Sequence, residues 1–572
     1  MRFARTRPKF LLLLVAVLAV GATGCFSDPN APPAPCAVSN VSAMGAPAGA
    51  QPVGSTTYPI PAGARFVSPT GSDAASGLVA TPWRTLTHAV EAAPANTTIV
   101  LRAGTYRETV VTRVDKRLTF QPYPNEAAWM SGSRAISGWV SDGNAWRKDN
   151  WTARFSRSWL NPAMIDPQFP MAGYPDMAFV DGTPLRQVGQ RADVVGGTFF
   201  VDELNSKLWI GNDPSGHVVE ASVLAEGLEV LAPDSIIRGL GFKHFANPIF
   251  RLGAVKASGA RMVVENNVII DNATAGLSVV SADVSVRRNT LTRNGQLGVH
   301  GEVATGMRLE ANVMSSNNSE RFVKSQAAGG VKITGSTGVL MRDNVADDNR
   351  SHGLWFDMKS HDATVIHNVT RRNASAGIFF ENSYRALIAG NVSTDNIAGI
   401  QTGQSRDVQV WNNVMVDNTY GFKAYKGHEE ASPTGFTLRN NVVSMRRSSG
   451  LPLLDNDDVT GSMTWAEMGW SSDFNAFYRR SSTANEFFEV LADGPDRLHY
   501  KDRQSIATAT GLERNSLSTD DVAVNPYVID SAACVYGLPV GSAARGRGTP
   551  LPLNVAAALG VPVGGSVDIG IV

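Results

Sequence analysis

The chain has few cysteines and no excess of charge of either sign. Its 572 residues include three cysteines, and 51 acidic side chains balance 51 basic ones. A chain without a basic excess lacks the electric field that attracts nucleic acids and anionic membranes. Its histidines also lack the spacing of a zinc site. We therefore expect neither a nucleic acid partner nor a cofactor.

The apolar run near the N-terminus is too short to span a bilayer. It covers residues 10–20 and follows four basic residues, Arg2, Arg5, Arg7 and Lys9. This arrangement predicts a secretion signal over residues 1–24. Residues 22–25 resemble the lipidation motif of bacterial lipoproteins, with Ala22 where that motif usually has Leu. The resemblance implies an exported protein that is anchored to a membrane by acyl groups on Cys25.

Two further cysteines, Cys36 and Cys534, remain after lipidation. Export permits a disulfide bond between them, but the sequence leaves their pairing open. Residues 25–64 are rich in Pro, Ala and Gly, which predicts a tether between the anchor and the folded part.

The feature that the chain does have is a repeated asparagine. Eight asparagines each end a short apolar alternation and follow one another at spacings of 22 to 32 residues: Asn267, Asn289, Asn312, Asn344, Asn368, Asn391, Asn413 and Asn441. Seven are followed five positions later by a second one: Asn272, Asn294, Asn317, Asn349, Asn373, Asn396 and Asn418. A period near 23 with one or two short strands per repeat predicts a solenoid, with asparagines stacked at two corners of the coil.

Two apolar positions recur in each repeat and predict the core. The first lies three positions before the first asparagine: Val264, Val286, Leu309, Met341, Val365, Ile388, Val410 and Leu438. The second follows a glycine that opens another strand: Leu277, Val299, Val331, Leu354, Ile378, Ile400 and Phe422. The pattern is typical of an all-β right-handed parallel β-helix, the fold of the pectin-lyase-like superfamily. Residues 223–445 are its predicted repeats.

The flanking segments differ from the repeats. Residues 65–133 resemble the N-terminal cap of many secreted β-helix proteins, with a short amphipathic helix from Thr85 to Ala93 over the open end of the coil. Residues 134–222 interrupt the repeat and predict an inserted β-rich subdomain. Residues 446–572 resemble the irregular late coils and tail of this class.

The outward positions of the second strand predict a binding surface. Two positions after the glycine, the coils carry Ser278, His300, Lys332, Trp355, Phe379, Gln401 and Lys423. Four positions after it, they carry Val280, Glu302, Thr334, Asp357, Glu381, Gly403 and Tyr425. Stacked strands lie ~4.8 Å apart, so these side chains form one surface. Aromatic rings stack on sugar rings and acids bind hydroxyls. We expect a polysaccharide or oligosaccharide to bind at His300, Glu302, Lys332, Trp355, Phe379, Gln401, Lys423 and Tyr425.

Asp357 and Glu381 are the candidate catalytic pair. They occupy equivalent positions on adjacent coils, and two carboxyl groups held that close should have pKa values pushed apart. That difference provides a general acid and an ionised partner, as glycoside hydrolysis requires. The segments Gly353 to Asp357 and Gly377 to Glu381 are similar to β-helical xylosidase-type glycoside hydrolases. The resemblance implies Asp357 as nucleophile and Glu381 as acid/base.

Other interpretations of this surface remain open. In a polysaccharide lyase or uronate epimerase, Lys332 or Lys423 is the base, and Asp357, Glu381 and Glu302 bind Ca²⁺. No Asp-Pro-His-Asp run of the alginate epimerase type occurs. The protein can also be a non-catalytic glycan-binding lipoprotein. In a purely structural interpretation, Asp357 pairs with Lys332, and Glu381 with Arg385 or Gln401.

Two smaller features complete the expectations. The loop 319–328 accounts for the longest repeat and is the candidate lid, with Arg321, Phe322 and Lys324 over the substrate. The histidines at 352, 361 and 367 are expected in solvated turns. We expect the protein to be a monomer.

Overall fold

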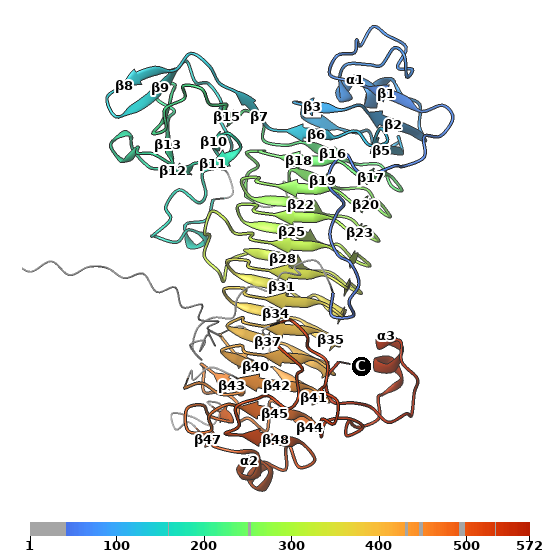
Figure 1. Cartoon of the computed structure of the whole chain (residues 1–572), viewed down its shortest axis with the longest axis vertical. Coiled ribbons are helices and arrows are strands. Elements are labelled where there is room, and N and C mark those ends of the chain that lie inside the picture. The colour runs from blue at the N-terminus through green and yellow to red at the C-terminus, as the bar shows by residue number, and fades with distance from the viewer. Residues whose placement is uncertain are drawn as a thin grey trace, which may run out of the picture.

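The computed structural model describes residues 42–157, 160–249, 253–428, 433–445, 450–490, 498–531 and 533–571. The signal 1–24, the lipidation residue Cys25 and its neighbour Cys36 lie outside these residues. The described chain is almost entirely β-structure and forms one long coil with a subdomain beside its first turns (Figure 1).

Three sheets of 13 strands each run the length of the coil. The first sheet holds β1 (Arg65–Val67), β2 (Thr97–Leu101), β5 (Leu118–Pro122), β17 (Ile236–Arg238), β20 (Val263–Glu265), β23 (Ser285–Arg287), β26 (Arg308–Glu310), β29 (Leu340–Arg342), β32 (His361–Ile366), β35 (Tyr384–Ala389), β38 (Arg406–Trp411), β41 (Thr434–Arg439) and β44 (Ser471–Asp473). The second holds β3 (Gly104–Tyr106), β6 (Ala128–Ser131), β18 (Gly241–Lys243), β21 (Val268–Ile270), β24 (Thr290–Thr292), β27 (Val313–Ser315), β30 (Val345–Asp347), β33 (Val369–Arg371), β36 (Val392–Thr394), β39 (Val414–Val416), β42 (Val442–Met445), β45 (Ala476–Arg479) and β48 (Leu517–Asp520). The third holds β4 (Val110–Val111), β16 (Leu228–Val230), β19 (Val255–Ala257), β22 (Ala275–Val279), β25 (Leu297–Glu302), β28 (Gly329–Thr334), β31 (His352–Asp357), β34 (Ala376–Glu381), β37 (Ala398–Gly403), β40 (Tyr420–Lys426), β43 (Leu454–Asp458), β46 (Phe488–Val490) and β47 (Leu498–Tyr500).

The chain visits the three sheets in the same order in every repeat, which makes a parallel β-helix. Neighbouring coils pair in parallel, as when β31 lies beside β34 with Trp355 opposite Phe379. Each repeat therefore has three strands, where the sequence pattern indicated one or two. The extra strand follows the first asparagine and is only three residues long in most coils, too short to show an alternation.

Two asparagine ladders form two corners of the coil, as predicted. Along the first, each side-chain amide donates to the Oδ1 atom of the asparagine on the next coil at 2.9–3.1 Å, from Asn267 to Asn475. The second ladder runs from Asn272 to Asn418 over the same range of distances. These amides replace water as partners for buried corner carbonyls.

The third corner carries serines that the sequence reading missed. The Ser360 hydroxyl accepts from the Ser336 backbone N–H at 3.3 Å, and the Ser405 hydroxyl accepts from that of Ser383 at 3.2 Å. All four serines are buried. They close the turn between the third and first sheets.

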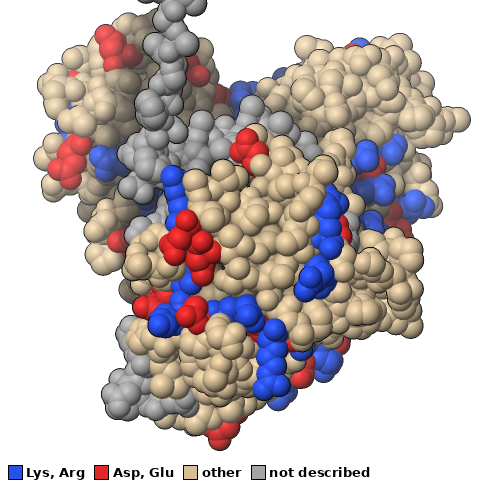
Figure 2. All heavy atoms as spheres, turned by 60° about the horizontal axis from the view of Figure 1, so that its bottom comes forward, with Lys and Arg blue, Asp and Glu red and all other residues tan. Residues whose placement is uncertain are grey.

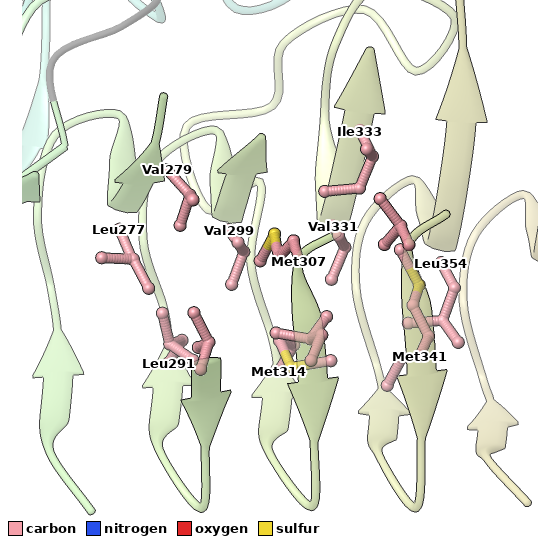
Figure 3. Packing of buried hydrophobic residues seen from close by; sticks show 14 of the residues in the cluster. Leu277, Val279, Leu291, Val299, Met307, Met314, Val331, Ile333, Met341 and Leu354 are labelled. Carbon is pink, nitrogen blue, oxygen red and sulfur yellow. The ribbon is translucent and has the colours of Figure 1, made fainter. Parts of the chain in front are cut away.

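The core lies inside the coil and consists of the predicted apolar positions. The residues three positions before each first asparagine are buried, and so are those that follow the strand-opening glycine. Figure 3 shows Leu277, Val299, Val331 and Leu354 stacked from coil to coil, with Leu291, Met314 and Met341 facing them.

Short helices cover the ends and one side of the coil. Helix α1 (Leu86–Ala92) begins after its N-cap Thr85 and buries Leu86, Ala89 and Val90 against the first coils. Helix α2 (Arg503–Thr510) closes the other end, and α3 (Leu553–Leu559) packs on the outer face of the first sheet. Within the described residues, no helix is long and apolar enough to cross a membrane.

Residues between β6 and β16 form a separate β-rich unit (Figure 1). One antiparallel sheet contains β7 (Ser133–Ala135), β10 (Ala178–Val180), β11 (Thr183–Pro184) and β15 (Val219–Ser222). The other contains β8 (Val140–Asp142), β9 (Ala145–Asp149), β12 (Arg186–Gln187), β13 (Thr198–Asp202) and β14 (Lys207–Ile210). Two 3₁₀ turns, Pro162–Met164 and Arg191–Asp193, lie in its loops. Trp151, Phe199 and Ile210 belong to its own small core.

The described part of the expected tether, residues 42–64, packs on the coil. The N–H of Ala43 donates to the carbonyl of His367 at 3.2 Å, and that of Gly49 to Ala311 at 2.8 Å. Ala43 and Ala48 cover valines on the outer face of the second sheet, which explains why this segment is not a free linker. Cys534 is disulfide-bonded, and Cys36, whose pairing the sequence left open, lies outside the described residues.

The surface mixes charges of both signs. Figure 2 shows acidic and basic side chains next to one another on the face it presents, as the balanced composition leads one to expect. On the outer face of the first sheet, for example, Glu310 pairs with Arg308 and Arg342.

Candidate functional site

A pocket of about 410 Å³ lies on the outer face of the third sheet. Its lining comes from four adjacent coils and from a wall beside them: His352, Trp355, Ser375, Phe379, Glu381, Gln401 and Tyr425 from the coils, and Asp166, Val323, Lys324 and Ser325 from the wall. Five of the residues predicted from the sequence thus meet in one cavity: Trp355, Phe379, Glu381, Gln401 and Tyr425.

The floor of the pocket is aromatic. The rings of Trp355 and Phe379 stack with centroids 5.5 Å apart and planes 23° apart, because the two residues are paired in register on β31 and β34. The sequence pattern placed both rings at outward positions of a binding surface, which would expose them to solvent. The structure corrects this, because Trp355 is 1% exposed and Phe379 3% exposed. The wall and neighbouring side chains cover both rings, so the rings also stabilise the fold.

Glu381 faces the pocket at the end of β34. Its Oε1 accepts a hydrogen bond from the Tyr425 hydroxyl at 2.8 Å, and its Oε2 accepts one from the Trp355 indole N–H at 3.2 Å. Burial and, to a smaller extent, the charge of Asp357 raise the pKa of Glu381 to about 7, although the two hydrogen bonds and the charge of Lys332 act in the opposite direction. A carboxyl group with this pKa is partly protonated near neutral pH, as a general acid must be.

Tyr425 reaches Glu381 across an intervening coil. Gly403 lies between them in the register, opposite both residues. A Cβ atom at position 403 would lie 2.5 Å from Cε1 and Cζ of the Tyr425 ring. The glycine therefore leaves the space that the tyrosine ring needs.

Asp357 lies on the coil next to Glu381 but is set back from the pocket lining. Its Oδ2 pairs with the Lys332 ammonium at 2.8 Å. Its Oδ1 accepts from the Met358 N–H at 2.6 Å and from the Asn382 amide at 3.2 Å. The expected Lys332 pairing is therefore present. Glu381, in contrast, bonds Trp355 and Tyr425 rather than Arg385 or Gln401.

Lys332 connects Asp357 to the aromatic floor. Its Nζ lies 3.5 Å from the centroid of the Trp355 ring, a cation–π distance. The Asp357 carboxylate and the Trp355 ring face both contact this Nζ atom. A lyase base must have its nitrogen free to reach the substrate, so this geometry disfavours Lys332 in that role.

The other predicted surface residues lie outside the pocket lining. Lys423 is held by Asp455 at 2.5 Å and Asp457 at 3.5 Å. His300 and Glu302 lie on β25, where His300 is in register with Lys332 and Glu302 with Thr334. The sequence pattern missed the Lys423 pairing because the asparagine repeat ends before Asp455.

The wall joins two segments that are far apart in sequence. Phe322 forms a bridge with Ile165, and the Val323 N–H donates to the Met164 carbonyl at 2.9 Å. The predicted lid loop 319–328 thus lies beside the pocket. Of its three expected contacts, only Lys324 lines the cavity. Phe322 is buried in the apolar cluster behind the wall, and Arg321 lies over the Phe169 ring at 5.1 Å.

His352 is the main pocket residue that the sequence reading undervalued. It was expected in a solvated turn but stands on β31 at 4% exposure. Its ring centroid lies 4.6 Å from that of Trp355 and 4.7 Å from that of Phe379. Burial lowers the pKa of His352 to about 3. The sequence did indicate that this position is buried, because small or apolar residues occupy it in other coils: Ala275, Leu297, Gly329, Ala376 and Ala398.

The described parts of the chain contain no group of three or more His, Cys, Asp or Glu side chains arranged to hold a metal ion. The alternative Ca²⁺ set of Asp357, Glu381 and Glu302 is therefore not assembled there. Asp357 is bonded to a lysine instead.

Comparison with known proteins agrees with this architecture. The family described as "Right handed beta helix region" matches residues 253–414 and 322–462. A family of unknown function, DUF1565, matches residues 69–113. The fold is a right-handed parallel β-helix, as predicted.

Two solved structures and one curated protein are similar to this chain. The structure of XylC in complex with xylose superposes with a TM-score of 0.54 over 81% of this chain and 86% of that one, at 13% sequence identity. A second structure, titled glycoside hydrolase, covers 84% of this chain and all of that one at 12% identity, with a TM-score of 0.42. The uncharacterized protein YwoF of Bacillus subtilis (strain 168) is 45% identical over 71 residues, which is 12% of this chain and 15% of that protein.

Proposed function

We propose that this protein is an exported glycoside hydrolase that cleaves a polysaccharide or oligosaccharide in the pocket of the third sheet. The observation that carries the proposal is Glu381, a half-buried carboxyl group that faces the pocket with its pKa raised to about 7, beside Asp357 on the adjacent coil. Glycoside cleavage requires a protonated acid beside a second carboxyl group, and here that second group is paired with Lys332. The likeness in fold to the xylose complex of XylC adds support.

The proposed reaction uses the two acids in succession. Protonated Glu381 gives its proton to the glycosidic oxygen, and the Asp357 carboxylate attacks the anomeric carbon as the leaving alcohol departs. This step leaves the sugar esterified to Asp357. Glu381 then takes a proton from water, and the resulting hydroxide displaces Asp357 and releases the sugar. Lys332 and Asn382 position the Asp357 carboxylate.

Product analysis tests this function. The protein would be incubated with plant and bacterial polysaccharides, and the products measured as new reducing ends and as absorbance at 235 nm. We expect reducing ends without an increase at 235 nm, because hydrolysis leaves no unsaturated uronate. An increase at 235 nm would support the lyase alternative. Binding without any product would support a glycan-binding lipoprotein.

The pH dependence should follow the ionisation of Glu381. The protonated carboxyl group is the active form of the acid, so kcat/KM should be retained below its pKa of about 7 and should fall as pH rises through that value. A profile of kcat/KM between pH 4 and 9 measures this limb.

Tyr425→Phe should shift the alkaline limb of the same pH profile in a defined direction. The Tyr425 hydroxyl stabilises the carboxylate of Glu381, so its removal should raise the pKa and move the alkaline limb to higher pH. Tyr384→Phe, on the first sheet, is the control and should leave the limb in place. A shift to lower pH in Tyr425→Phe would contradict the assignment of Glu381.

The location of the protein is a separate proposal, because Cys25 lies outside the described residues. We expect the mature chain to begin at Cys25 and to stay with the membrane fraction through several acyl chains. Cys25→Ala should release it into the soluble exported fraction, while Cys36→Ala should not. Fractionation and N-terminal sequencing measure both. Soluble wild-type protein with another N-terminus would show that this interpretation is wrong.

A further inference from the structure

The pocket has two ends, and the proposed chemistry uses only one. Glu381 and Tyr425 lie at the C-terminal ends of their strands, whereas His352 and Ser375 lie at the opposite edge. His352 is two positions before Leu354, which is paired with Ile378, so His352 lies beside Ala376. Glu381 lies five positions after Ala376 along β34, so their backbones are roughly 16 Å apart. A glycan that reaches Glu381 can therefore extend over the aromatic floor toward His352.

The hydrogen bonds of His352 define where its proton lies. The backbone N–H of Ala376 donates to Nδ1 of His352 at 3.3 Å. A backbone N–H can only donate, so Nδ1 must be the unprotonated nitrogen of a neutral ring. The proton is then on Nε2, which lies 3.4 Å from the Ser375 hydroxyl. Burial, which lowers the pKa of His352 to about 3, keeps the ring neutral in this tautomer at physiological pH.

The surroundings of His352 fix its orientation. Its ring is stacked on Phe379 at an interplanar angle of 27° and is tilted against Trp355. Both rings contact it from the floor of the pocket, and Ser375 lines the pocket beside it. A donor held in this way loses little rotational freedom on binding. The adjacent hydroxyl can either donate or accept.

We infer that the Nε2–H of His352 and the hydroxyl of Ser375 together bind a ring hydroxyl of the glycan at the end of the pocket opposite Glu381, and thereby select the sugar that is bound. The inference deepens the proposed function and rests on it for the kinetic part of the test. The ligand class is a neutral sugar with a free hydroxyl at that position. The cavity lining carries charges of both signs, since Asp166 and Lys324 both belong to it.

Two variants of His352 separate hydrogen bonding from packing. His352→Phe keeps an aromatic ring between Trp355 and Phe379 but removes both ring nitrogens. His352→Gln keeps a donor and an acceptor. The probe is the nitrophenyl glycoside that the wild-type protein cleaves fastest among neutral pentosides and hexosides, together with its monodeoxy derivatives.

We expect His352→Phe to raise KM about ten- to hundredfold with kcat changed less than about threefold, because the lost bond is made equally in ground and transition states. His352→Gln should recover most of the loss. One monodeoxy derivative should be cleaved poorly by the wild-type protein and no worse by His352→Phe. Equal losses in His352→Phe for every deoxy derivative would overturn the inference.

A direct measurement does not depend on turnover. Nitrogen-15 NMR of histidine-labelled protein should show a neutral His352 ring with its proton on Nε2 at pH 6. A proton on Nδ1, or a charged ring, would overturn the inference even if hydrolysis is confirmed. If the wild-type protein cleaves none of the glycosides, the proposed function fails, and binding of the parent monosaccharides is measured by saturation-transfer NMR. Binding that His352→Phe weakens would still support the inference, and absent or unchanged binding would overturn it.

Discussion

Glu381→Gln and Asp357→Asn are each expected to reduce turnover by at least about 10²-fold while leaving the fold intact. Each substitution keeps the shape of the side chain and one of its two acceptor oxygens. The first removes the proton that must pass to the glycosidic oxygen. The second removes the negative charge that must attack or stabilise the anomeric carbon. Initial rates on the best polysaccharide or glycoside, with a melting curve for each variant, measure the effect.

The two losses should differ in character. Glu381→Gln should also abolish the alkaline limb near pH 7, since that limb belongs to its carboxyl group. Asp357→Asn leaves Lys332 without its ionic partner, so part of its effect can be structural. The melting temperature distinguishes this from a catalytic loss. Glu302→Gln is the matched control, because it changes a carboxyl group on the same sheet that does not line the pocket.

One pattern of results would reject the hydrolase assignment. If both acid variants keep nearly wild-type activity and Lys332→Ala loses it, the lyase interpretation gains support. Loss of activity in Lys332→Ala together with both acid variants is expected of a hydrolase, because Lys332 holds Asp357 in place.

Asn391→Ala should lower the free energy of unfolding by about 3 kcal/mol or more. The Oδ1 of Asn391 accepts from both the backbone N–H and the side-chain amide of Asn368, each at 2.9 Å. Its own amide donates to Asn413 and to two backbone carbonyls. The substitution leaves buried donors on one coil and buried acceptors on its neighbours without partners.

Thermal unfolding measures this loss, and Asn554→Ala is its control. Asn554 is an exposed asparagine on helix α3, where the substitution should change stability by less than about 0.5 kcal/mol. Because each coil contacts only its neighbours, proteolysis should be enhanced first near the altered coil. Equal stability of both variants would show that the ladder contributes little.

The fold could be predicted because the residues that specify it recur at a short and regular spacing. The asparagine spacing, the inward residues such as Val365 and Ile388, and the adjacent positions of Asp357 and Glu381 all follow from a repeat of about 23 residues. In a parallel solenoid, equal positions in the repeat must stack. The three-residue strand after the first asparagine was not predicted, because three residues are too few to show an alternation of apolar and polar side chains.

The pocket was predicted only in part. Trp355, Phe379, Glu381, Gln401 and Tyr425 belong to one stacked surface, so the period alone places them together. The wall comes from the inserted subdomain and from loop 319–328, which meet at Ile165 and Phe322. No repeat connects these segments, and nothing in either one specifies the other.

The sequence by itself determined the coil, its core and the neighbouring positions of two acids and two rings. In a solenoid, residues at equal positions of neighbouring repeats stack on one another, so the repeat pattern is sufficient to place these features. Only the tertiary structure decided that the groove is a walled pocket, that Asp357 is held by Lys332, and that His352 is a buried neutral donor. These features depend on burial and on contacts between distant segments, and burial is what shifts the protonation of His352 and Glu381.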